Sequence, residues 1–116
     1  MSSPETLNPL YKNLINKKIA KLPIVVNIYG GQTEQTLEQR QKQHEEKDNK
    51  FRNMIIEEIF SSSKETQVNQ INLAETYLIE LLHTTYGKKC LNKVMVGGGG
   101  QHHNLGDNHK IYIMYK

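Results

Sequence analysis

The sequence predicts an α+β domain with a small, mostly antiparallel sheet of about three strands and two to three helices packed on one face. Three segments repeat apolar residues at helical spacing, and three short runs of β-branched or alternating apolar residues lie before or after them. The length of 116 residues is that of one domain. We therefore interpret residues 1–116 as a single domain and expect residues 1–7 to be disordered.

The first predicted element is a helix over residues 9–20. Asn8 is suited to cap its N-terminus, and Pro9 suits the first helical position, where the missing N–H of proline has no cost. Pro23 then ends the helix. A strand follows over residues 24–28, where four of five residues are apolar and β-branched, so we expect it to be buried on both faces.

The longest periodic segment predicts a single helix from about residue 33 to residue 60. Its first half, residues 34–50, has almost no apolar face, whereas its second half places Phe51, Ile55 and Ile59 on one side. A helix that is polar for half its length projects into water, pairs with another chain or frays. We therefore expect residues 34–50 to offer a surface for association.

A second long helix is expected over residues 65–86, because this segment carries a continuous apolar stripe. Ser62 and Glu65 match the pattern of a capping box at its start. Gly87 stands where a left-handed C-terminal cap is expected. The chain therefore supplies clear start and stop signals for this helix.

Two further strands are expected over residues 90–97 and 109–116, and they would form an antiparallel hairpin. A glycine- and histidine-rich segment joins them. Ordering four consecutive glycines has a large cost in conformational entropy. We therefore expect residues 97–108 to be a flexible connector that becomes ordered on contact with a partner, rather than a preformed chemical site.

The same segment holds the candidate metal ligands, and they are His102, His103, Asp107 and His109. Zinc needs three or four such groups in a tetrahedral array, but adjacent histidine rings diverge unless the backbone is extended or kinked, and no CxxC or HExxH motif is present. The glycines lead into a strand rather than a helix, which disfavours phosphate binding. A pair of Cys90 with a loop histidine has no support in the sequence. We therefore predict no cofactor, no metal and no enzymatic activity.

Charge and composition limit the setting of the protein. The net charge is +3, the two ends are basic and the middle is acidic. The single cysteine excludes an internal disulfide, no signal peptide is visible, and no apolar run approaches the roughly 20 residues that span a bilayer. We expect a cytoplasmic protein without membrane association, or one delivered to a host cytosol if it is an effector.

The sequence favours a small non-catalytic protein-binding module, such as an inhibitor, adaptor or regulator of the kind that a pathogen or phage uses against an enzyme. A homodimer is expected as well. One alternative is a lysine-rich nucleic-acid-binding protein, although thirteen Lys and only two Arg disfavour base reading. Another is a metal-dependent protein that uses the histidine loop. The predicted partner-binding residues are Arg40, His44, Lys47, Gln101, His102, Tyr112 and Tyr115.

Overall fold

The computed structural model describes residues 6–61, 68–92 and 109–116, which form three main helices and a three-stranded sheet. The strands have the order β1-β3-β2, and both pairings are antiparallel. This confirms the predicted α+β class. In chain order the elements are α1 (Pro9–Ala20), β1 (Ile28–Thr33), α2 (Leu37–Lys47), β2 (Ile55–Ser61), α3 (Val68–Tyr86) and β3 (Lys110–Tyr115), with short 3₁₀ helices at Asn49–Phe51 and Gly87–Lys89.

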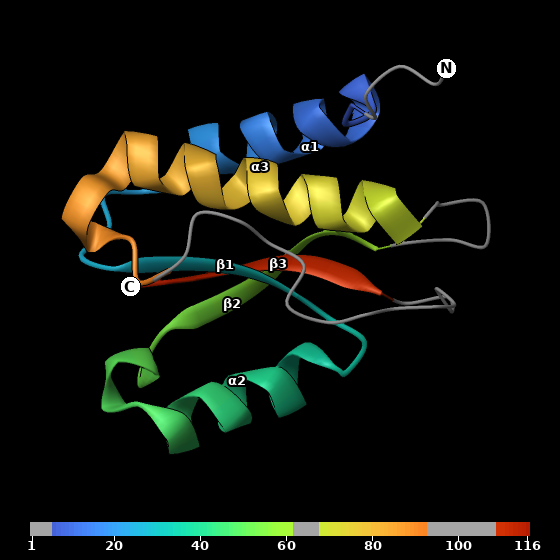
Figure 1. Cartoon of the computed structure of the whole chain (residues 1–116). Helices are drawn as coiled ribbons and strands as arrows, with labels where there is room; N and C mark the ends of the chain where they lie inside the picture. The colour runs from blue at the N-terminus through green and yellow to red at the C-terminus, as the bar shows by residue number, and fades with distance from the viewer. Residues whose placement is uncertain (1–5, 62–67, 93–108) are drawn as a thin grey trace.

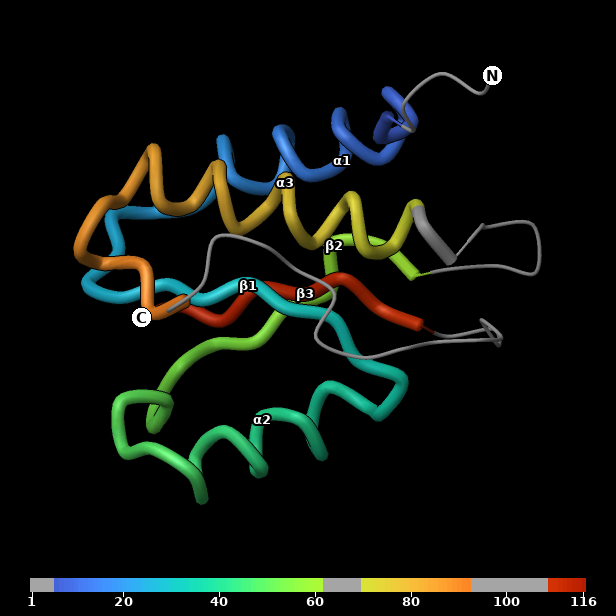
Figure 2. Tube along the Cα trace, in the orientation of Figure 1, coloured from blue at the N-terminus to red at the C-terminus, as the bar shows by residue number. Residues whose placement is uncertain are grey.

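Two helices cover one face of the sheet, as predicted, and the third covers the other. Figure 1 shows α1 and α3 above the sheet and α2 below it. The tube in Figure 2 shows β3 between its two neighbours. As the central strand, β3 is buried on both faces, so its side chains alternate between two cores. Ile111, Ile113 and Tyr115 pack toward α1 and α3, whereas Tyr112 and Met114 pack toward α2.

The first helix has the predicted bounds and caps. The Asn8 side chain accepts a hydrogen bond from the Leu10 N–H at 2.9 Å, and Pro9 is the first helical residue. The strand predicted over residues 24–28 is wrong in its placement, because β1 begins only at Ile28. Ile24 is 96% exposed and Val26 is 68% exposed, so of the apolar run before Ile28 only Val25 enters the core while the run connects α1 to the sheet.

The single long helix predicted over residues 33–60 is also wrong. The helix α2 ends at Lys47, and the apolar half of the segment forms β2. Turn chemistry separates the two elements. The Asp48 side chain accepts a hydrogen bond from the Lys50 N–H at 3.0 Å, and Asn53 takes a left-handed conformation at φ 64°. Asp and Asn favour such turns, so they interrupt the helix despite the favourable apolar spacing.

The end of α3 agrees with prediction, because Tyr86 is followed by Gly87 at φ +57°. The strand predicted over residues 109–116 is present as β3. The predicted capping box at Ser62 and the loop over 97–108 lie outside the described residues, as does most of the strand predicted over 90–97. Within the described part of that strand, Cys90 forms a parallel bridge with Ile28. The predicted antiparallel hairpin with residues 109–116 is wrong, because β3 pairs with β1 along one edge and with β2 along the other.

Two adjacent glycines in β1 allow close packing on both faces of the sheet. A Cβ atom at Gly30 would lie 2.7 Å from Leu78 Cδ2, and one at Gly31 would lie 2.7 Å from the Tyr112 hydroxyl oxygen. Both distances are shorter than van der Waals contact. The absence of side chains therefore lets α3 approach one face and the Tyr112 ring lie against the other.

Candidate functional site: the cavity beneath α2

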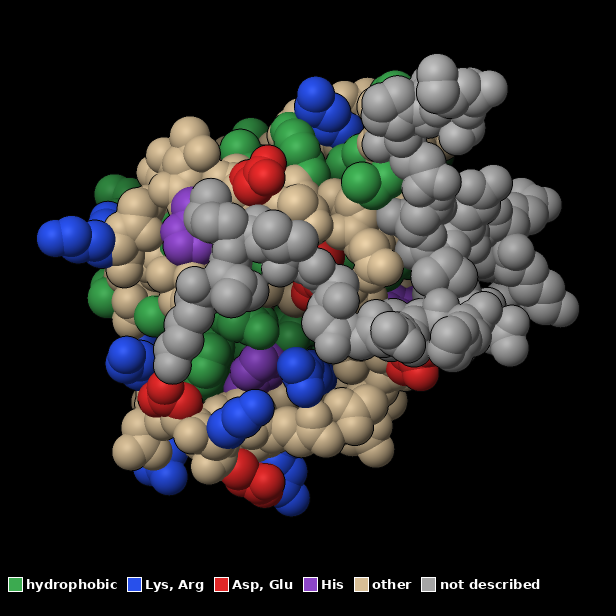
Figure 3. All heavy atoms as spheres, viewed as in Figure 1, with side chains coloured by type: hydrophobic (Ala, Val, Ile, Leu, Met, Phe, Trp, Pro, Cys, Tyr) green, Lys and Arg blue, Asp and Glu red, His purple; other side chains and the backbone are tan. Residues whose placement is uncertain are grey.

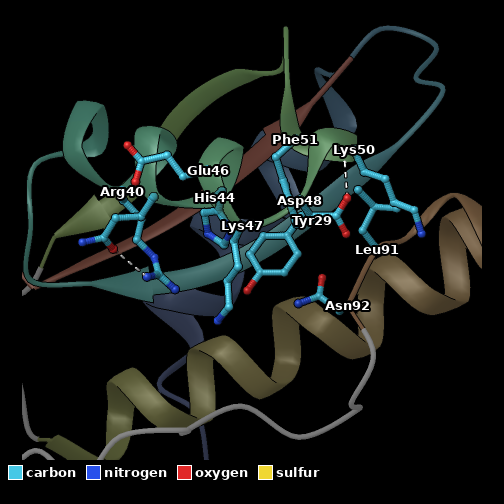
Figure 4. Close-up of a pocket in the computed structure, with 11 residues that line it drawn as sticks. Tyr29, Arg40, His44, Glu46, Lys47, Asp48, Lys50, Phe51, Leu91 and Asn92 are labelled. Carbon is cyan, nitrogen blue, oxygen red and sulfur yellow. Dashed lines mark hydrogen bonds between the residues drawn. The ribbon is translucent and has the colours of Figure 1, made fainter.

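A cavity of about 790 Å³ opens between α2, the 3₁₀ helix that follows it, β1 and the segment after α3. This size lies within the range of small-molecule sites in proteins. Figure 4 shows its lining as sticks, with Tyr29 of β1 near the centre and Arg40, His44 and Lys47 of α2 beside it. Residues far apart in the sequence therefore build one concave surface.

Three rings form an aromatic wall of the cavity. Tyr29 packs edge-on against His44, with ring centroids 4.8 Å apart, and edge-on against Phe51 at 5.2 Å. The His44 and Phe51 rings are 4.6 Å apart. Such edge-to-face packing is favourable because the positive edge of one ring meets the negative face of the next. The rings therefore support one another and hold the wall in place.

The hydroxyl of Tyr112 connects two α2 side chains behind this wall. Arg40 Nε donates to the Tyr112 oxygen at 3.2 Å, and the same oxygen lies 2.8 Å from His44 Nε2. Because arginine only donates, we assign the Tyr112 proton to the bond with His44. The His44 ring is then neutral, with its own proton on Nδ1.

Burial and nearby cations keep His44 neutral. Burial lowers the pKa of His44 to about 4, and the charges of Arg40 and Lys47 act in the same direction. Burial also raises the pKa of Tyr112, so its hydroxyl remains protonated near neutral pH. The network is therefore a set of neutral groups bonded to one partly buried guanidinium.

Replacing Tyr112 with phenylalanine is expected to lower the free energy of unfolding by about 1–2 kcal/mol, because Arg40 and His44 lose a buried partner. Urea denaturation measures the loss. Tyr77→Phe is the matched control, because the Tyr77 hydroxyl donates to Asn16 Oδ1 at an exposed position, and we expect a loss of no more than about 0.5 kcal/mol. Equal losses in the two variants would contradict the buried network.

Cations surround the cavity without ion-pair partners. Arg40, Lys47 and Lys50 line it, and among the described residues no carboxylate lies within ion-pair distance of any of them. Figure 3 shows Lys and Arg side chains close to histidine and hydrophobic surface at the junction of α2 with the rest of the molecule. This arrangement favours a ligand or partner that carries negative charge.

The structure separates the predicted partner-binding residues. Arg40 and Lys47 meet at the cavity, and His44 is buried in its wall. Tyr112 is 0% exposed and Tyr115 is 8% exposed, so neither offers a ring surface to a partner, and their predicted role as surface anchors is corrected. Their burial follows from the central position of β3. Gln101 and His102 lie outside the described residues.

Of the predicted metal ligands, only His109 is described, since His102, His103 and Asp107 are not. The His109 ring is 1% exposed, and its Nε2 lies 2.6 Å from Gln32 Oε1. Its Nδ1 lies 3.5 Å from a Glu34 carboxylate oxygen. Within the part of the chain that the structure describes, no group of three or more His, Cys, Asp or Glu residues could hold a metal ion.

The segment after α3 closes the cavity at β1. Asn92 Oδ1 accepts from the Gly30 N–H at 3.0 Å, and Asn92 Nδ2 donates to the Gly30 carbonyl at 2.8 Å, so its side chain pairs with the strand edge. The Cys90 thiol donates to Asn92 Oδ1 at 3.4 Å, and burial raises its pKa. A thiol in this setting is a poor nucleophile.

Comparisons of the chain with models of known families, with characterised proteins and with solved structures find no match. None of the helices in the described residues is long and apolar enough to cross a membrane.

Proposed function

We propose that the protein is a small non-catalytic protein-binding module that acts in the cytoplasm as an inhibitor, adaptor or regulator, and that it contacts its partner through the outer face of α2. The observation that carries this proposal is the contrast between how firmly α2 is held and how little it buries. Its side chains add only His44 and the half-buried Leu37 to the cores.

Both ends of α2 are fixed. Thr36 and Gln39 form a reciprocal capping box at the start, with bonds of 3.2 and 3.3 Å. At the other end, the Asp48 N–H donates to the His44 carbonyl at 3.0 Å. A rigid helix has little conformational freedom left to lose on association. Its outer face carries the exposed side chains of Glu38 and Lys42, and such mixed charges orient a partner.

The alternative surface is the edge of β2 that is not bonded to β3. Glu57 and Glu58 lie in this strand, and the pairing is irregular between Glu58 and Phe60. Charged residues and bulges are the features by which edge strands avoid pairing with other chains. A twofold pairing through this edge would bring like charges together. We therefore place any self-association, including the expected homodimer, on α2 as well.

Site-specific photo-crosslinking in cells of the native source tests the proposal. A photoreactive residue in place of Lys42 is expected to capture one defined polypeptide, because Lys42 is exposed on the outer face of α2. Lys17 is the matched control, since it is an exposed lysine of α1 on the opposite face of the sheet. Lys42→Glu should abolish co-purification of the captured protein, whereas Lys17→Glu should not change it.

Capture from both positions, or from neither, would contradict the proposal. A crosslinked species that nuclease removes would favour the nucleic-acid alternative instead. Capture of a second copy of the chain would identify the partner as the homodimer. Far-ultraviolet circular dichroism of both glutamate variants should match that of the unmodified protein, because both lysines are exposed.

A further inference from the structure

We propose that the cavity beneath α2 binds a nucleotide, with the phosphate near Arg40 and Lys47 and the base near Phe51 and Leu91. This inference goes beyond the protein-binding function and does not depend on it, because the proposed partner surface is the opposite side of α2. Lys47 lines the cavity, whereas Lys42 does not.

A set of hydrogen-bond donors lies at one end of the cavity. Figure 4 shows the side chains of Arg40 and Lys47 and the hydroxyl of Tyr29 directed toward the same end. A phosphate monoester offers three terminal oxygens and nearly two negative charges. Three donors from different side chains can each bind one of the three phosphate oxygens, whereas a carboxylate ligand offers only two oxygens.

Arg40 is already held in position by its neighbours. Its Nε donates to Tyr112 at 3.2 Å, and its Nη1 donates to Gln43 Oε1 at 3.1 Å. Arginine has five N–H donors in a fixed fork, so these two bonds hold the guanidinium and leave further donors for a ligand. A group fixed in this way loses little freedom when the ligand binds.

The other end of the cavity is apolar. Figure 4 shows Phe51 and Leu91 on the side of the Tyr29 ring away from its hydroxyl. Both side chains are only partly buried, although they pack against the core formed around Tyr112 and Met114. A planar base is suited to such a surface, because stacking on aromatic rings tolerates every base.

Two carboxylates also line the cavity, and neither faces the phosphate end. Asp48 is bound to the Lys50 N–H and lies toward Leu91. The Glu46 carboxylate is directed away from the Tyr29 hydroxyl. The Lys50 side chain adds a third cation to the lining, so positive charge exceeds negative charge around the cavity. The field therefore favours an anionic ligand.

Titration of the ¹⁵N-labelled protein with adenosine monophosphate, adenosine and inorganic phosphate tests the proposal by NMR. The monophosphate is expected to bind saturably and to shift the amide signals of α2 and β1, and the other two compounds should bind more weakly. Lys47→Gln should weaken binding of the monophosphate by about tenfold, because it removes a charged hydrogen bond. Lys42→Gln removes the same charge from the other side of α2 and should change the affinity less than twofold.

Three results would overturn the proposal. The first is no saturable binding of the monophosphate. The second is an equal effect of the two lysine variants, which would indicate diffuse electrostatic attraction. The third is inorganic phosphate binding as tightly as the monophosphate, which would show an adventitious ion only. A short oligoadenylate that binds more tightly through Lys47 would identify single-stranded nucleic acid as the nucleotide source, and no gain would identify a free nucleotide.

Discussion

Replacing Gly30 with alanine is expected to lower the free energy of unfolding by about 2–3 kcal/mol, because the new methyl group overpacks the core. It would lie 2.7 Å from Leu78 Cδ2 and 3.0 Å from Leu82 Cδ1. Both leucines are completely buried in α3, so a shift of either side chain disturbs the close-packed core around it. Urea denaturation followed by circular dichroism measures the change.

A double-mutant cycle identifies the cause of this loss. Leu78→Ala alone should cost about 3 kcal/mol through the cavity it leaves, but it should cost less in the Gly30→Ala background, where it also relieves the contact. Gly87→Ala serves as the control, because its methyl group would meet no atom within 4 Å and only the left-handed φ of +57° opposes it. The free energy of unfolding of that variant should fall by about 1 kcal/mol. Strictly additive losses at Gly30 and Leu78 would contradict the packing argument.

Lowering the pH from about 6.5 to 4 is expected to remove about 3 kcal/mol of stability through His44. The pKa of His44 is about 4 in the folded protein, against 6.5 for an ordinary histidine. Between these values the unfolded chain binds a proton that the folded protein excludes, so stability falls as the pH falls. Above pH 6.5 the histidine is neutral in both states, and below pH 4 it is protonated in both.

His44→Gln isolates this contribution, because glutamine does not titrate and its side-chain oxygen can accept a hydrogen bond from Tyr112. Urea denaturation of both proteins across the pH range should give curves that diverge between pH 6.5 and 4, with the variant less sensitive to acid. The carboxylates also respond to acid, but they are the same in both proteins. Parallel curves would show that the folded protein does not exclude the proton from His44.

The sequence predicted those elements whose ends carry local chemical signals. Asn8 and Pro9 marked the start of α1, and Gly87 marked the end of α3, because capping depends on neighbouring residues alone. The segment around β2 was misread because Met54, Ile55 and Ile59 suit one face of a helix as well as a strand. The turn at Asn53, together with pairing to β3, decided the outcome.

The candidate site could be predicted only in part. Arg40 and Lys47 lie on the same side of α2, two turns apart, so their shared face follows from helical spacing. No local pattern predicts that Tyr29 and Phe51 join them, because those contacts depend on how α2 folds back over the sheet. Tyr112 was expected at the surface because tyrosine is enriched at interfaces, and its place in the central strand buried it instead.

The strand order has a consequence for how the chain is made. β3 is the last of the three strands to leave the ribosome, yet it lies between the other two. Ile28 and Ile55 both pair with Tyr115, so neither β1 nor β2 has its sheet partner until that residue has been synthesised. Sheet formation must therefore wait until translation has passed β3, and it then requires closure of long loops, which is slow. During that interval the nascent chain exposes two unpaired strands, and protection by a chaperone at this stage would favour its correct folding.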